Sequence, residues 1–136
     1  MPYYKCIVPE DSVEFETRKA VAKAFTDIHC GETGAPRSFV HCEFIEYPEG
    51  GETGYDSGTP YYMDGGNRAG RPQEVKDQLL SELLGAFVEI TGISRDDIDG
   101  RITEGKASQT MEGGFVLPEP GEEGPEWYEH DSVAAD

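Results

Sequence analysis

The chain has 136 residues, the usual size of one domain, and its 28 acidic side chains against 11 Lys and Arg give a formal net charge of −17. This charge disfavours nucleic acid and anionic membranes as partners, and no apolar run reaches the ~18 residues of a membrane span. The N-terminus lacks the basic and apolar segments of an export signal, so we expect a cytoplasmic protein, and the shortage of lysine favours a halophilic, salt-rich cytoplasm.

The first half of the chain predicts a strand, a helix and a second strand. Residues 3–8 have the apolar and aromatic character of a strand. From about residue 14 to residue 30, apolar side chains recur at helical spacing, and the glycines that follow end this helix. Residues 39–47 alternate in character and predict the second strand, whereas residues 48–59 are rich in Gly, Glu and Asp and predict a loop.

The second half of the chain repeats this order. Residues 61–63 predict a short strand, and Pro72 suits the first turn of a helix that runs to about residue 90. That helix has a broad apolar face, and Gly92 ends it. Residues 97–104 predict a fourth strand with weak strand propensity.

The two halves align without a gap at an offset of 58 residues. Segments 2–46 and 60–104 share eight identical pairs in 45 positions, where chance gives about three. We interpret this as two βαβ units in tandem: an α+β fold with one four-stranded sheet and both helices on one face. Such a unit leaves the other sheet face bare, so a homo-oligomer that buries it is expected.

The whole chain, 1–136, is predicted to be one domain with a C-terminal extension at 105–136. The aromatic residues of this extension indicate that its first part, through Tyr128, docks either onto this chain or onto a neighbouring subunit. The last few residues are expected to fray.

Cysteine and histidine do not predict a metal site. The three cysteines, Cys6, Cys30 and Cys42, form no CxxC motif and are expected to be reduced thiols. The pairs His29-Cys30 and His41-Cys42 consist of adjacent residues, which point in different directions and rarely converge on one ion. We expect neither a metal nor another cofactor.

Pro2 and an arginine pair are the first candidates for chemistry. Removal of Met1 would expose the secondary amine of Pro2, a base when neutral and an acid when protonated, although many chains simply begin Met-Pro. Arg68 and Arg71 lie three residues apart before a helix and can converge on one carboxylate, or form surface ion pairs with the many acids. Arg37 and Arg95 lie at matched repeat positions and are assigned to ion pairs.

His29 and Glu112 are two further candidates. His29 lies at the end of the first predicted helix, where it either contacts a ligand or packs and caps the helix. Glu112 is one acid among 28, but Gly113-Gly114 after it allow a tight turn that presents it to a pocket.

Together these residues resemble the tautomerase superfamily, and within it the cis-3-chloroacrylic acid dehalogenase group, fused two-unit relatives of 4-oxalocrotonate tautomerase. The resemblance covers about residues 2–128. It is carried by Pro2, Ala20-Val21-Ala22-Lys23-Ala24, Thr26-Asp27-Ile28-His29, Gly31 with Thr33-Gly34, Phe44 before Pro48, Arg68-Ala69-Gly70-Arg71, Lys76-Asp77-Gln78-Leu79, Leu117-Pro118-Glu119-Pro120-Gly121, Glu123-Gly124 and Glu126-Trp127. It implies a trimer of α+β subunits that acts without a cofactor on a small carboxylic acid.

The resemblance also implies roles for single residues. Pro2 would be the catalytic acid or base, Arg68 and Arg71 would bind the substrate carboxylate, and His29 would hold or polarise the substrate. Glu112 would activate a water with help from a tyrosine, but here the tyrosine's position falls on Arg101 or on Gly100. Arg101 either adds positive charge to the site or lies at the surface, paired with acids.

This departure favours tautomerisation of a small unsaturated or enol carboxylic acid, which needs a carboxylate clamp, a base and a dry site. The alternatives are a hydratase or dehalogenase of 3-haloacrylate or acetylenic acids and a non-catalytic carboxylate-binding homologue. An interaction domain of ferredoxin-like fold without a pocket is a further alternative.

Overall fold

The computed structural model describes residues 1–48 and 58–134, so most of the loop expected at 48–59 lies outside the described residues. The helices and strands are β1 Tyr3–Pro9, α1 Phe15–Thr33, β2 His41–Tyr47, β3 Tyr61–Arg68, α2 Gln73–Thr91, β4 Ile98–Gly105, β5 Met111–Glu112, β6 Phe115–Val116 and α3 Pro125–Ala134. Short 3-10 turns precede β2, β4 and β5. No helix in these ranges is both long and apolar enough to cross a bilayer.

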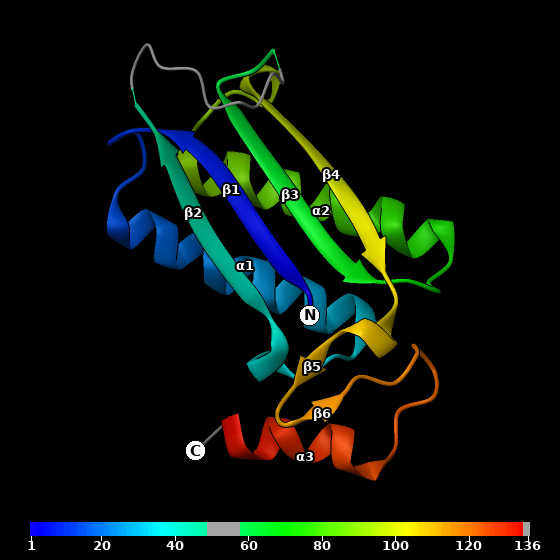
Figure 1. Ribbon diagram of the computed structural model, residues 1–136. Helices are drawn as coiled ribbons and strands as arrows, with labels where there is room; N and C mark the ends of the chain where they lie inside the picture. The colour runs from blue at the N-terminus through cyan, green and yellow to red at the C-terminus, as the bar shows by residue number, and fades with distance from the viewer. Residues whose placement is uncertain (49–57, 135–136) are drawn as a thin grey trace.

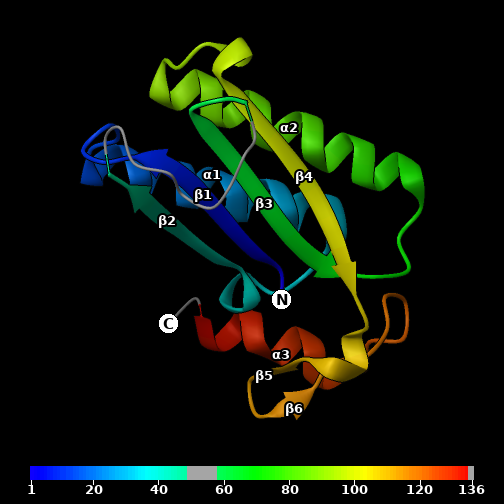
Figure 2. The same cartoon turned by 45° about the horizontal axis from the view of Figure 1, so that its top comes forward.

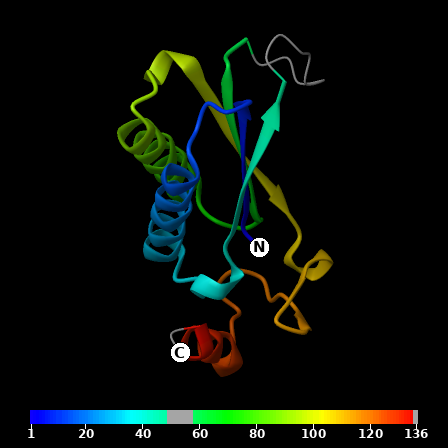
Figure 3. The same ribbon diagram turned by 90° about the vertical axis from the view of Figure 1, so that its left-hand side faces the viewer.

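One four-stranded sheet, in the order β2-β1-β3-β4, carries α1 and α2 on one face (Figure 1). Strands β1 and β2 are parallel, as are β3 and β4, and the two pairs meet through the antiparallel contact of β1 with β3. This arrangement confirms the predicted tandem of βαβ units. In the side view (Figure 3) both helices lie on one side of the sheet, and no described element covers the other face.

The core forms between the sheet and the two helices. On β1, the alternate residues Tyr4, Cys6 and Val8 are buried toward the helices, whereas Tyr3 and Lys5 point to the uncovered face. The apolar stripes of α1 and α2 pack against these inward side chains, as the helical spacing predicts. The residues at the start of β1 are therefore fixed by the core on one side.

The two units correspond closely in local structure. Helices α1 and α2 each have 19 residues, and their first and last residues are 58 positions apart. Gly34 and Gly92 end them in the left-handed conformation, with φ of 73° and 76°. A non-glycine residue would be strained at either position, so both helices stop at the same place in the repeat.

Strand β3 is longer than the three residues that the sequence predicts. It extends to Arg68 through Asp64-Gly65-Gly66-Asn67, a segment that pairs with β1 and β4 although glycine disfavours strands. A side chain at Gly65 would lie 2.6 Å from Cε1 of Tyr4, so glycine is required for the ring to fill this space. Arg68 consequently lies at the end of a buried central strand and not in a loop.

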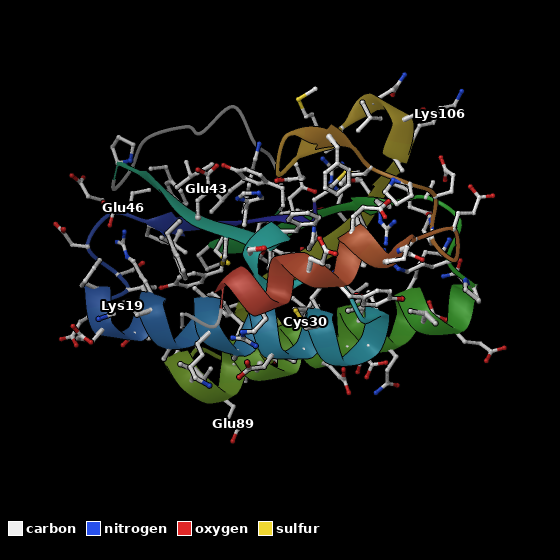
Figure 4. The ribbon with its side chains drawn as sticks, turned by 90° about the horizontal axis from the view of Figure 1, so that it is seen from below. Lys19, Cys30, Glu43, Glu46, Glu89 and Lys106 are labelled. Atoms are coloured by element: carbon white, nitrogen blue, oxygen red, sulfur yellow. The ribbon has the colours of Figure 1, made fainter. Side chains whose placement is uncertain are left out.

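The C-terminal extension packs onto its own chain. A second small core joins Ala35, Phe39, Ala107, Leu117 and Trp127. Trp127 is buried and its ring lies 5.1 Å from the Phe39 ring, whereas Tyr128 is exposed. The helix α3, which the sequence did not predict, lies next to β5, β6 and the start of β1 (Figure 2) and crosses the end of the sheet and helix layers (Figure 4).

Candidate active site

Most of the candidate residues gather at the end of the sheet that holds the start of β1. Because β1 runs antiparallel to β3, its first residues lie beside the last residues of β3, with Tyr3 opposite Gly66. The last turns of α1 pack beneath this end, and β5 lies next to it (Figures 1 and 2). Residues from four distant parts of the sequence are thereby brought together.

The terminal amino group contacts Glu112. In this structure the amine belongs to Met1, and it forms a short hydrogen bond and ion pair with the Glu112 carboxylate. Burial lowers the pKa of the amine, as does the positive charge of Arg68, whereas the bond and charge of Glu112 act in the opposite direction. A terminal amine with a lowered pKa is more often neutral, and so a better base, near neutral pH.

Pro2 follows directly and is buried. Its carbonyl accepts a hydrogen bond of 3.0 Å from the backbone N–H of His41, which anchors the start of β1 to the start of β2. Removal of Met1, which the small second residue favours, would move the terminal amine to Pro2 at this anchored position.

His29 lies in a buried hydrogen-bond network with Tyr4 and Asn67. The side-chain amide of Asn67 donates to the Tyr4 hydroxyl at 3.4 Å, and that hydroxyl lies 2.7 Å from Nδ1 of His29. With its own oxygen accepting from Asn67, Tyr4 donates its proton to Nδ1, so the neutral imidazole carries its hydrogen on Nε2. Burial raises the pKa of Tyr4 to about 12, which keeps this donor protonated.

The other ring nitrogen of His29 is a free donor inside the protein. Nε2 is buried and has no hydrogen-bond partner among the described residues. Burial, with the positive charges of Arg71, the terminal amine and Arg68, lowers the pKa of His29 to about 3, so the ring is neutral at pH 7. A neutral, buried and unpartnered N–H is suited to bind the oxygen of a ligand.

Tyr4→Phe is expected to release the tautomer of His29 and to lower the free energy of unfolding by about 1–3 kcal/mol, because Nδ1 loses its donor in a buried site. Nitrogen-15 NMR of the imidazole measures the tautomer, which should be the Nε2–H form in the wild type and a mixture in the variant. Tyr47→Phe, which removes an exposed hydroxyl bonded to the Pro60 carbonyl, is the matched control. An unchanged tautomer in Tyr4→Phe would contradict this assignment.

The two arginines of the predicted clamp have different surroundings. Arg68 is buried, and its guanidinium donates to the Pro118 carbonyl at 2.6 Å and to the Glu123 carboxylate at 2.9 Å, with Trp127 stacked 4.4 Å away. Arg71 is half-buried, and its only printed hydrogen bond is a long one, 3.4 Å, to the Arg68 carbonyl. Arg71 therefore keeps donors for a ligand, whereas Glu123 already neutralises Arg68.

A cavity of about 320 Å³ adjoins the arginine pair. Its lining includes Arg71, Val75, Glu123 and Trp127 together with the end of α1. Burial and the nearby charge of Arg68 both lower the pKa of Arg71, although a guanidinium remains charged at any physiological pH. The cavity is large enough for a small carboxylic acid, but Pro2, His29 and Glu112 do not line it.

Arg101 lies apart from these residues. It is on β4 and forms a two-pronged ion pair with Asp64 on β3, with both distances 3.1 Å. In the sheet register it is four positions before Gly105, which pairs with Arg68, so it lies more than ten ångströms along the strand from the arginine pair. Within the described residues, no three His, Cys, Asp or Glu side chains are grouped to bind a metal.

Sequence reasoning did not identify Tyr4, Asn67, His41 and Glu123 as parts of this region. His41 was considered only as a metal ligand, yet its Nε2 lies 3.1 Å from each carboxylate oxygen of Glu112. Tyr4 had a usable signal, because strand alternation turns its hydroxyl toward the helix that carries His29. Glu123 is one of several acids in the extension, and nothing in the sequence distinguishes it.

Comparison with known proteins identifies relatives among solved structures. No protein-family model and no curated protein matches the sequence. The native protein Ps01740 is 29% identical, covers 81% of this chain and 99% of its own, and has a TM-score of 0.74. N1, a member of the cis-3-chloroacrylic acid dehalogenase family, is 23% identical over 98% of this chain and 99% of its own, with a TM-score of 0.84.

The wild-type fused 4-OT F6, an asymmetric trimer, is 18% identical over 84% of this chain and 94% of its own, with a TM-score of 0.70. The match with N1 covers almost the whole of this chain, C-terminal extension included. These likenesses agree with the tandem βαβ arrangement of the sheet and helices.

Proposed function

We propose, from the premise that this chain is a fused, two-unit structural relative of the tautomerase superfamily, that it is an enzyme that moves a proton on a small unsaturated or enol carboxylic acid. The observation that carries this proposal is the convergence at one end of the sheet. The terminal amine, Glu112, the free Nε2–H of His29 and Arg71 are close enough for their charges to act on one another. Solved relatives include a dehalogenase-family member, a fused 4-OT and a malonate semialdehyde decarboxylase, which supports an enzymatic role.

The proposed mechanism assigns each residue a separate task. Arg71 binds the substrate carboxylate, and Arg68 contributes positive charge while it holds Glu123. The Nε2–H of His29 donates to the enol or carbonyl oxygen, where negative charge develops when a proton leaves or joins carbon. The Pro2 amine, exposed after Met1 removal, takes the proton from one atom and returns it to another.

Addition of water is the second candidate function, and the position of Glu112 favours it. The Glu112 carboxylate lies against the terminal amine, and its pKa is lowered: burial raises it, but the hydrogen bonds from the amine and from His41 lower it by more. An ionised carboxylate beside an acidic amine is the pair needed to deprotonate a water and protonate a carbon. We also propose a homotrimer, as in the fused 4-OT relatives, with the uncovered sheet face inside it.

Two measurements test the proposed function. The intact mass decides whether Met1 is removed, and retention of Met1 would exclude Pro2 as the catalytic amine. Turnover of 2-hydroxymuconate, phenylenolpyruvate and cis-3-chloroacrylate at high salt then separates tautomerase from hydratase or dehalogenase activity. Turnover of none of the three, together with binding of a small carboxylate, would instead support the non-catalytic homologue.

Arg71→Ala is expected to weaken carboxylate binding by about 1.5–3 kcal/mol, or roughly ten- to a hundredfold in kcat/KM, because a charge-assisted bond is lost. Steady-state kinetics on the best substrate measure it. Arg37→Ala is the matched control, since Arg37 is exposed and pairs with Asp27 at 2.6 Å. If Arg71→Ala and Arg37→Ala have equal kcat/KM, Arg71 does not bind the substrate.

A further inference from the structure

His41 connects the candidate site to the edge strand β2. Its backbone N–H donates to the Pro2 carbonyl at 3.0 Å, and its ring stacks on Tyr3 at 5.7 Å with 26° between the planes. These two contacts fix the ring at the start of the sheet. Nε2 then lies 3.1 Å from both oxygens of Glu112, the carboxylate that also contacts the terminal amine.

We propose that His41 is a positioning residue that orients the Glu112 carboxylate for deprotonation of a water beside the Pro2 amine. The inference rests on the proposed function in its water-adding form. One N–H centred between two carboxylate oxygens limits rotation of the Glu112 side chain, and the glycines after Glu112 provide no such restraint. His41 contacts neither the water nor the substrate in this scheme; it acts through Glu112.

The water-adding step balances with these groups alone. Glu112 accepts a proton from water as the water oxygen forms a bond to the β-carbon of the unsaturated acid. The ammonium of Pro2 gives a proton to the α-carbon, and the double bond is consumed. The Glu112 carboxylic acid then passes its proton to the neutral Pro2 amine, which restores both groups, while His41 keeps its proton throughout.

Two variants of His41 separate orientation from simple packing. His41→Phe keeps a ring to stack on Tyr3 and loses the donor, whereas His41→Gln keeps an N–H at a similar reach. Water addition to cis-3-chloroacrylate is expected to fall about tenfold or more in His41→Phe and to be largely restored in His41→Gln. Tautomerisation of phenylenolpyruvate, which does not require Glu112, is expected to change less than twofold.

The ionisation of Glu112 provides a measurement independent of activity. Carbon-13 NMR of the carboxyl group, assigned with Glu112→Gln, is expected to show a higher pKa for Glu112 in His41→Phe than in the wild type or His41→Gln. Glu119→Gln, an exposed acid of the same extension, is the control for the assignment. An unchanged Glu112 pKa in His41→Phe, or equal losses of both activities, would overturn the proposal.

Failure of the proposed function is distinguishable from failure of this inference. If the wild type adds water to none of the substrates, the hydratase function is wrong. The NMR comparison still decides whether His41 orients Glu112.

Discussion

Replacing Pro2 with alanine is expected to lower kcat by about a hundredfold or more, the usual contribution of a positioned general acid or base. Met1 is still removed before alanine, so the variant keeps a terminal amine at the same residue. That amine is primary and free to rotate, whereas the pyrrolidine ring fixes the amine of Pro2 beside Glu112 and the carbonyl bonded to His41. Steady-state turnover of the best substrate, with the intact mass confirmed for both proteins, measures the change.

Pro60→Ala is the matched control for this variant. Pro60 occupies the equivalent position of the second unit, precedes β3 as Pro2 precedes β1, and is exposed. It carries no free amine, so its replacement should leave kcat within about twofold. Equal rates for the wild type and Pro2→Ala would remove the terminal amine from the mechanism.

Arg68→Ala is expected to have the largest effect on stability, about 3 kcal/mol at pH 7, or a decrease of roughly 10 °C in Tm. The buried guanidinium holds the Pro118 carbonyl, the Glu123 carboxylate and the face of Trp127 at once. Its removal leaves Glu123 without its ion pair and loosens the second core. Thermal unfolding measures the loss, and limited proteolysis should show cleavage starting within residues 118–128.

The pH dependence of this destabilisation identifies its cause. Burial raises the pKa of Glu123, but the hydrogen bond from Arg68 lowers it by more, so the folded pKa lies below the ordinary 4.5. The stability from this pair is therefore present above pH 4.5 and is lost as the pH falls through the lowered pKa. The difference between wild type and Arg68→Ala should shrink over that range.

Arg101→Ala serves as the control, because its pair with Asp64 is exposed and contributes about 0–1 kcal/mol. If Arg101→Ala and Arg68→Ala had the same Tm, the anchoring role of Arg68 would be wrong.

The main elements of the fold were predictable because their signals are local. The apolar spacing of α1 and α2 and their terminal glycines define both helices to within a few residues. The continuation of β3 through Gly65 and Gly66 was not predictable, since it depends on the Tyr4 ring filling the space of a missing side chain. That contact joins residues 61 positions apart, and no window along the sequence contains both.

The candidate site was predictable to a similar extent. Pro2 and Arg71 are conspicuous by chemistry and spacing, and the structure leaves Arg71 with donors for a ligand. The separation of Arg68 from Arg71 depends on Glu123 folding back across more than 50 residues. His41 depends on the parallel pairing of β1 with β2, which sets its backbone beside Pro2.

The correspondence of the two units has a consequence for how such a chain changes over time. At the offset of 58 residues, the second unit has Phe87 where the first has His29, and the first has Glu10 and Val13 where the second has Arg68 and Arg71. Each half has therefore specialised: one provides the terminal amine and the imidazole, the other the guanidinium groups. Neither half alone contains a full complement, so covalent fusion makes their complementary losses tolerable and ties both halves to a single shared centre.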